Sequence, residues 1–454
     1  MASPNDALIP ELWAQEAINL MWENFLFGQL FHTEFKNQIA VAGDVVNTSR
    51  PVRMRAHRKN SDIQTINDQT ARSTNIKVEL NQQIYVSFLL GSRDRSLSFV
   101  DLTSKYLVEA MQAQIRMIDR SIAGHIALFL ANAVGTSGTI SASNAYNQLT
   151  LARKKLNDYN VPEPNRRFVF GNRSDIAFLQ DDRFINSDYN GMGGTAVREA
   201  YLGRTLGFDM FRSPNLPMAE NCPQQSPTTV DGAAAAGATT IDVATGTAPA
   251  VNSYIEIAGE GSPNLVTGVS TDTLTLKRPL RNAVADGAAV KIFSQGAVNN
   301  AAGHDAGDNF DAKANGYAAN WAEDIAVDGN VPAVGQIISF ASHDAEYVVV
   351  NLEGSNILLD RPLEAAIDDN DTVALAGDFE LNFAFNPKAI GIISRPLAVE
   401  MEGTGVRSAI AEGYGFGVRV DIGFDGTKQA QRVTISSLLG LKQLDEERGV
   451  PLLA

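Results

Sequence analysis

Two segments of the chain carry apolar residues at every third or fourth position, the spacing of an amphipathic helix. In residues 101–133 the spacing is regular and predicts one helix of about 50 Å. Its apolar face carries Leu107, Met111, Ile115, Ile118, Ile122, Ile126 and Phe129. Residues 8–35 show the same spacing with few breakers before Gly28, and predict a helical N-terminal arm. Trp13 and Trp22 lie in this arm. They are interpreted as core residues that pack on the rest of the chain, and the alternative is that they dock in a groove of a partner.

Between these helical segments, apolar and polar residues alternate in the manner of strands. Residues 76–80 and 84–88 alternate strictly, so we expect a long extended β-excursion over residues 50–95. Its tip, residues 61–74, contains almost no large apolar side chain. The tip has little reason to pack on its own core, and we expect a group outside this chain to hold it.

Residues 144–220 have the pattern of an α/β region. It predicts a helix at 145–158, a strand at 167–170 and a glycine-rich loop at 191–194. Near the other end of the chain, the pattern predicts a strand at 432–435 followed by an acidic tail segment.

Residues 228–379 consist of short alternating segments separated by Gly, Asp and Asn, and they contain an internal repeat. Three segments recur at a constant offset of 83 residues: 249–251 as 332–334, 255–258 as 338–341, and 274–280 as 357–363. Val290 and Ile292 of the first copy match Val373 and Leu375 of the second, so the same alternate positions are apolar in both copies. Both copies should therefore turn the same face of the strand inward. A unit of about 60 residues is marginal alone, so we expect the copies to share one core or to pack closely.

Composition and charge limit the possible classes of protein. A chain of 454 residues, 44% hydrophobic and 20% charged, is globular and long enough for two or three domains. A net charge of −15 argues against wrapping nucleic acid and favours solubility at high concentration. Cys222 is the single cysteine, which excludes an intrachain disulfide and a cysteine-based zinc site. Because we find no signal-peptide pattern and no membrane-length apolar run, we expect cytoplasmic synthesis without standard export.

No motif supports catalysis, and we expect no catalytic, cofactor-binding or metal-binding residues. The glycines at 191–194 lack the lysine of a phosphate loop, and those at 403–417 lack the context of a dinucleotide fingerprint. The five histidines show no zincin spacing, and His125 is interpreted as a packed core residue. His304, Asp305, Asp308 and Asp311 could together bind a calcium ion, but their spacing is not that of a calcium-binding loop. We interpret them as a solvated acidic loop.

One basic cluster stands out in this acidic chain: Arg50, Arg53, Arg55, Arg58 and Lys59. On an extended segment these side chains could meet phosphates or an acidic surface on a neighbouring copy. The net charge favours protein contact. We therefore predict Arg53, Arg55 and Arg58 as inter-subunit contact residues.

The order of these parts resembles the Hong Kong 97 fold of tailed-bacteriophage major capsid proteins. Four segments are similar to the coat proteins of short-tailed Salmonella-type phages: 207–217, 338–341, 389–397 and 438–453. The resemblance implies an α+β fold with A and P domains and an inserted all-β domain. The implied divisions are an N-terminal helical arm (1–49), an E-loop (50–98), the spine helix with the first part of the body (99–227), the insert (228–379, repeats about 230–295 and 320–377) and the rest of the body (380–454).

The resemblance also implies a function. A protein of this family self-assembles as hexamers and pentamers into an icosahedral shell that encloses double-stranded DNA, without sequence-specific binding and without a membrane. The implied partners are a scaffolding protein, a portal and, in some members, a decoration protein. The implied location is the virion capsid, assembled in the host bacterial cytoplasm. This chain departs from the family in having two copies of the insert repeat.

Two other functions stay open on the sequence. Repeated small β-domains also serve adhesion, so a virion- or cell-surface binding protein is the main alternative. A hydrolase would need carboxylates that converge in a pocket, which sequence does not reveal.

Overall fold

The computed structural model describes a defined part of the chain. The described residues are 10–31, 33, 45–50, 54, 56–61, 65–66, 68, 74–91, 103–186, 202–220, 222, 224–293, 295–298, 325–328, 331–341, 343–353, 356–365, 367, 371–399, 406–413, 415–428 and 430–454. The chain divides into two compact units. The first contains Met1–Asn24, Phe31–Gln114 and Lys388–Asp445, and the second contains Phe25–Leu30, Ile115–Pro387 and Glu446–Ala454.

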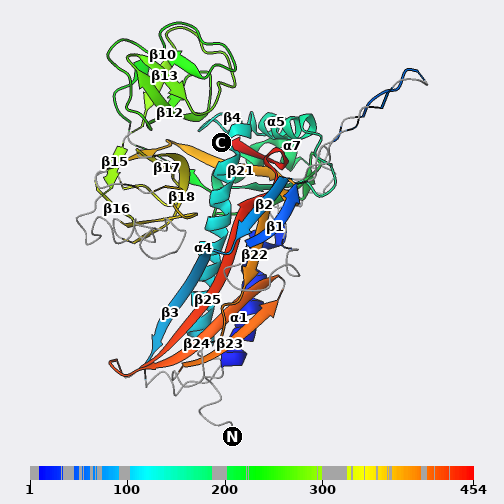
Figure 1. Cartoon of the computed structure of the whole chain (residues 1–454), viewed down its shortest axis with the longest axis vertical. Coiled ribbons are helices and arrows are strands. Elements are labelled where there is room, and N and C mark those ends of the chain that lie inside the picture. Colours follow the sequence, from blue (N-terminus) through cyan, green and yellow to red (C-terminus); the bar gives the residue numbers. More distant parts are fainter. Residues whose placement is uncertain are drawn as a thin grey trace. The chain divides into compact units, whose positions relative to one another are not determined.

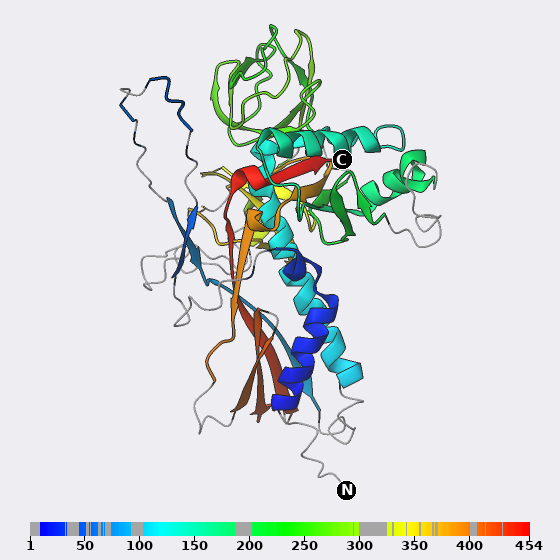
Figure 2. The same cartoon turned by 90° about the vertical axis from the view of Figure 1, so that its right-hand side faces the viewer.

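The first unit is built on a five-stranded antiparallel sheet (Figure 1). Its strands are β22 (Ile390–Arg395), β25 (Ala430–Gln443), β24 (Phe416–Asp425) and β23 (Val406–Gly413) in that order, with β3 (Gln82–Leu90) paired to β25. Helix α1 (Pro10–Asn24) packs on β23 and β24, as Figure 2 shows. Trp13 and Met21 of α1 are buried, which favours the core-packing interpretation of Trp13.

The first unit also carries a two-stranded arm. Strand β1 (Val45–Arg50) pairs with β2 (Thr74–Glu79) in an antiparallel sheet of their own. Val78 of β2 and Leu80, just after it, are buried in a small apolar cluster with Ile393 and Leu438. The alternation at 76–80 and 84–88 is thus confirmed as strands β2 and β3.

The second unit contains a seven-stranded mixed sheet. Its order is β4 (Val134–Gly135), β26 (Gly449–Leu453), β21 (Phe379–Phe385), β5 (Arg167–Phe170), β7 (Phe208–Arg212) and β6 (Arg204–Thr205), with β8 (Met218–Ala219) paired to β21. Helices α5 (Ala145–Asp158), α6 (Asn172–Gln180) and α7 (Asp182–Ile185) pack with it around a phenylalanine-rich core. The predictions of a helix at 145–158 and a strand at 167–170 are confirmed. The predicted strand at 432–435 is part of β25 (Ala430–Gln443), and the acidic residues Glu446 and Glu447 follow it. The chain then ends in β26, which is buried and pairs with β21.

Two six-stranded β-units lie between β8 and β21 in the sequence, and we call them the first and second β-repeats (Figure 1). The first contains β9 (Thr228–Thr229), β10 (Thr240–Asp242), β11 (Tyr254–Ile257), β12 (Pro263–Ser270), β13 (Thr273–Leu276) and β14 (Ala289–Ile292). The second contains β15 (Gln295–Val298), β16 (Ile325–Asp328), β17 (Ile337–Phe340), β18 (His343–Glu353), β19 (Asn356–Leu359) and β20 (Thr372–Leu375). In the first β-repeat, neighbouring strands follow the order β10-β13-β12-β11-β14-β9. In the second, a closed barrel, they follow the order β16-β19-β18-β17-β20-β15. The two orders are the same, because β9 to β14 correspond one by one to β15 to β20.

The two β-repeats also match in backbone detail at the offset of 83 residues. Val266 N donates to Ser253 O at 2.9 Å, and Val349 N donates to Gln336 O at 3.0 Å. A β-bulge follows Val266 in β12 and Val349 in β18. Of the two arrangements expected, a shared core is not observed, because each β-repeat encloses its own apolar cluster. Direct contacts between the repeats agree with the other, close packing. In the second β-repeat, closing the sheet into a barrel lets even a short unit bury an apolar interior.

The long helical segment is not one uniform helix. It contains a π-helical turn η4 (Thr103–Leu107), the α-helix α4 (Val108–Gly124) and a 3₁₀ segment η5 (His125–Asn132). The predicted apolar stripe is buried along its length, but the prediction of a single α-helix over 101–133 is wrong. The change after Gly124 occurs where the second β-repeat packs closely on the helix.

The predicted N-terminal helix is also interrupted. It breaks at Phe25, and a short helix α2 (Leu26–Leu30) follows in the second unit. The Phe25 ring occupies the space beside Gly28, where a Cβ would lie 2.1 Å from Phe25 Cε1. Glycine at this position therefore permits the tight packing of the break.

Candidate functional site

The β-repeats leave and rejoin the second unit at one place. Strands β8 and β21 pair so that Ala219 lies opposite Phe379 and Met218 opposite Glu380. Glu380 is fully buried, and its carboxylate accepts hydrogen bonds from the backbone N–H groups of Arg173 and Ser174 at 2.9 Å each. These groups begin α6, where a negative charge is favoured by the helix dipole. The point of return is therefore fixed to the sheet and to α6.

The predicted contact residues are only partly visible. Arg53 and Arg55 lie outside the described residues, whereas Arg58 lies in the described stretch 56–61 and is exposed. The glycine-rich loop at 191–194 and the acidic group at 304–311 also lie outside the described residues. His125 is buried, in agreement with its interpretation as a packed core residue.

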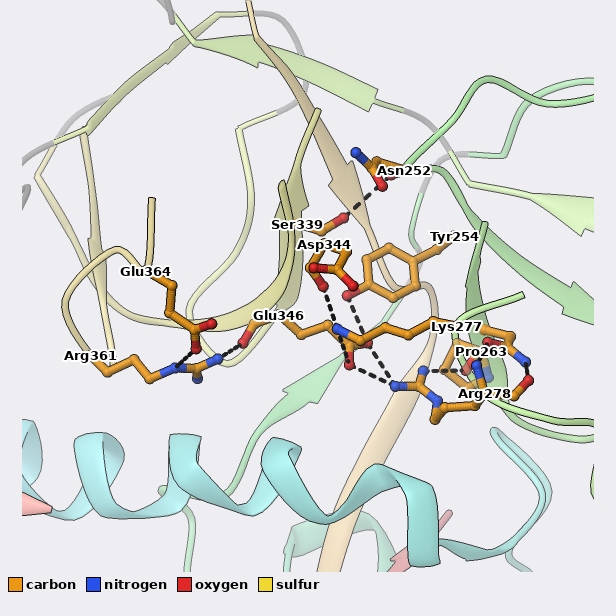
Figure 3. Close-up of polar contacts among 11 residues, drawn as sticks. Asn252, Tyr254, Pro263, Lys277, Arg278, Ser339, Asp344, Glu346, Arg361 and Glu364 are labelled. Carbon is orange, nitrogen blue, oxygen red and sulfur yellow. Dashed lines mark hydrogen bonds and ion pairs between the residues drawn. The ribbon is translucent and has the colours of Figure 1, made fainter. Parts of the chain in front are cut away.

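A buried ionic cluster joins the two β-repeats, and sequence reasoning missed it (Figure 3). Glu346 of β18 accepts from Arg278 Nη1, with Oε2 at 2.6 Å and Oε1 at 2.9 Å. Its Oε1 also accepts from the Tyr254 hydroxyl at 3.0 Å, and Lys277 Nζ lies 3.4 Å from Oε2. Glu346 comes from the second β-repeat, and the other three residues come from the first. We call these four residues the inter-repeat cluster.

The charges in the inter-repeat cluster stabilise one another. Burial alone would raise the pKa of Glu346, but the positive charges of Arg278 and Lys277 outweigh burial and hold that pKa below its usual value. Burial and the nearby carboxylate raise the pKa of Tyr254 well above its usual value, so its phenol keeps the proton that it donates. A carboxylate with three donors around it meets the condition under which a buried charge is tolerated.

The repeated Arg-Pro-Leu sequence has a structural explanation in this region. Arg278 Nη2 donates to the carbonyl of Pro263 at 2.9 Å, and Arg361 Nη2 donates to the carbonyl of Glu346. Residues 263 and 346 are also 83 positions apart, so both arginines fasten the equivalent strand of their own repeat. The signal for Arg278 was therefore present in the sequence. Glu346 gave no such signal, because it replaces a proline of the first copy.

A second ion pair, between the half-buried Arg281 and the buried Glu260, fastens the first β-repeat to the body of the second unit. Arg281 donates to the carbonyls of Ala133 at 2.9 Å and Gly135 at 3.1 Å, just after η5. Glu260 accepts from the backbone N–H of Arg281 at 2.8 Å and lies 3.5 Å from its Nε. Ser137 N also donates to Gly261 O at 2.8 Å. A cation at the end of a helix is favoured by the dipole.

The single cysteine lies in the connection from β8 to the first β-repeat and contacts the second. Cys222 N donates to Asp378 Oδ1 at 2.7 Å, and its thiol donates to Gln336 Oε1 at 3.2 Å. Burial raises the pKa of this thiol to about 11. The thiolate is the reactive form of cysteine, so Cys222 is a poor nucleophile at neutral pH.

The contacts described above hold parts of the chain together. Within the described residues, no group of three His, Cys, Asp or Glu side chains could hold a metal ion. No helix in the described part of the chain is long and apolar enough to cross a membrane.

Comparisons with known proteins give only distant structural similarity. No protein-family model matches the sequence, and no curated protein sequence matches it. A structure from Mycobacterium phage Che8 matches with 12% identity and a TM-score of 0.45, over 94% of this chain and 91% of that chain. The capsid structure of the cyanophage P-SCSP1u matches with 12% identity and a TM-score of 0.42, over 91% and 84%. The asymmetric unit of the mature capsid of bacteriophage PhiM1 matches with 10% identity and a TM-score of 0.38, over 91% and 82%. These scores are low, so the function proposed below rests on the chain's own elements.

Proposed function

We propose that this protein is the major capsid protein of a tailed bacteriophage. In this proposal it assembles with copies of itself, as hexamers and pentamers, into an icosahedral shell around double-stranded DNA. A scaffolding protein, a portal and a decoration protein are its proposed partners, and the host cytoplasm is the proposed place of assembly. Electron microscopy of the protein produced with its scaffolding protein tests the proposal.

The observation that carries the proposal is the arm of the first unit. Strands β1 and β2 form a two-stranded sheet, and a sheet of this kind needs packing against other elements to be stable in water. At its base, Val78 packs on Ile393 and Leu438 of the first unit. Beyond these strands, Met54 is 62% exposed and Ile66 is 74% exposed. A neighbouring copy would bury these side chains, as a shell subunit requires.

Within this proposal the parts take the roles of the Hong Kong 97 fold. The arm is the E-loop, α4 belongs to the spine helix, and the sheets of the first and second units belong to the P and A domains. The two β-repeats form the insertion domain at residues 228–379. The pairing of Ala219 with Phe379 supports this boundary, because an inserted domain needs closely spaced points of exit and return.

A fragment of residues 228–379 should fold without the rest of the chain. Each β-repeat has its own apolar core, and the inter-repeat cluster lies wholly inside the fragment. We expect a cooperative thermal transition by circular dichroism. A gradual loss of signal with no transition would contradict an independent insertion domain.

The arginines of the arm are proposed to bridge copies. Replacing Arg53, Arg55 and Arg58 with Ala should lower the yield of sedimenting shells severalfold, because their charges would no longer meet acidic groups on a neighbour. A control with the same charge change replaces the exposed residues Lys154, Arg204 and Lys428. Equal shell yield and stability for wild type and the arm variant would overturn this assignment.

A further inference from the structure

The long helix changes type where the second β-repeat touches it. Helix α4 ends at Gly124, and the 3₁₀ segment η5 continues for eight residues. Runs of 3₁₀ helix longer than three or four residues are uncommon, and such a stretch inside a helix often marks a hinge. A Cβ on Gly124 would lie 2.4 Å from the Cβ of Asp360. Gly124 has ordinary helical angles, φ −57° and ψ −38°, so glycine is needed here for space.

His125 is the first residue of η5, and its side chain contacts both the last turn of α4 and the second β-repeat. Its Nδ1 is 2.9 Å from the Ser121 carbonyl oxygen and 3.7 Å from Asp360 Oδ2. Because a carbonyl only accepts, Nδ1 carries the hydrogen in the first contact. The imidazole thus binds the last turn of α4 while facing the carboxylate of the β-repeat.

Asp360 is held rigidly by its own repeat. Its Oδ1 accepts from Val348 N at 2.8 Å, and its Oδ2 accepts from Arg361 Nη1 at 3.0 Å. The bulge residue Val350 adds a contact, because its carbonyl accepts from Arg120 of α4 at 3.3 Å. A bulge interrupts the strand ladder locally and frees backbone groups for other partners. The position of Asp360 at Gly124 therefore follows that of β18 and β19.

We propose that Gly124, His125 and Asp360 form a helix latch, through which the second β-repeat holds residues 125–132 in their 3₁₀ form. Displacing the second β-repeat from Gly124 would release η5, and straightening the helix would displace the repeat. The latch couples the position of an outer β-unit to the conformation of the long helix. This inference goes beyond the proposed function and does not depend on it.

Hydrogen exchange of the full-length protein, followed by mass spectrometry of peptides covering residues 125–132, tests the latch. In Gly124→Ala the new methyl group would push Asp360 away, and we expect exchange at least about tenfold faster. Alanine is a better helix former than glycine, so an independent helix would instead exchange more slowly in this variant. The two explanations therefore predict opposite signs.

A second variant keeps the latch testable if Gly124→Ala fails to fold. Asp360→Asn preserves the acceptor for Val348 N but removes the charge that faces His125, and it should also speed exchange of residues 125–132. Glu364→Gln is the matched control, because it lies near Asp360 with a side chain 60% exposed and 3.5 Å from Arg361 Nε. Unchanged exchange in Asp360→Asn, or slower exchange in Gly124→Ala, would overturn the latch.

Discussion

Replacing Glu346 with Ala should destabilise the protein by about 3–5 kcal/mol, the usual penalty for removing one partner of a buried ion pair. The variant would leave the Arg278 guanidinium buried without the carboxylate that lies 2.6 Å away. It would also remove the acceptor of the Tyr254 hydroxyl. We expect a lower urea midpoint for the transition that includes the β-repeats, measured by circular dichroism at neutral pH.

Three further measurements make this prediction specific. Removing both Glu346 and Arg278 should cost less than the sum of the single replacements, because no buried charge then lacks a partner. The penalty should also shrink as the pH falls through the lowered pKa of Glu346, since protonation removes the attraction in the wild type as well. Glu364→Ala, at an exposed ion pair, should cost less than about 1 kcal/mol. Equal penalties for Glu346→Ala and Glu364→Ala would contradict a structural role for the cluster.

Replacing Asp119 with Asn should stabilise the protein at pH 8 and above. Burial raises the pKa of Asp119 to about 8 from 3.8, and the hydrogen bonds from Phe27 N and Asn215 Nδ2 only partly oppose this. Both contacts are long, at 3.4 Å. The folded protein therefore holds Asp119 protonated at pH values where the unfolded chain ionises it.

The sign of the pH dependence follows from this raised pKa. Asp119 favours the folded state fully below pH 4, and this contribution is lost as the pH rises to about 8. A shift of this size corresponds to roughly 6 kcal/mol. Wild type should lose stability between pH 4 and 8 relative to Asp119→Asn, as measured by urea unfolding. Asp158→Asn, at an exposed residue of α5, is the control. Parallel pH profiles for wild type and Asp119→Asn would show that Asp119 is already ionised in the folded protein.

Local patterns predicted those elements that local interactions determine. The helix at 145–158 and the strand at 167–170 occur where apolar spacing placed them. The constant offset of 83 residues predicted two matching β-units, because the same side chains repeat the same inward phase. Arg278 and Arg361 occupy matching positions in the repeated segments 274–280 and 357–363, but the repeat does not show what they bind.

Features that depend on distant contacts could not be predicted in this way. The 3₁₀ form of η5 follows a close approach of Asp360, which is far from Gly124 in sequence. Strand β26 is only five residues long and is recognisable through its pairing with β21. Glu346 replaces the proline at 263, so the repeat pattern gave no reason to expect a buried carboxylate there. The ion pairs that fasten the β-repeats join residues far apart in the sequence, whereas the basic residues of the arm are close together in it.

Electron microscopy of the protein produced together with its scaffolding protein tests the central proposal most directly. The proposal predicts closed icosahedral shells of uniform size, built from many copies of this chain, with the exposed side chains of Met54 and Ile66 buried against a neighbouring copy. Protein that stays monomeric under all conditions, with the scaffolding protein present and folded, would contradict the assignment as a capsid subunit.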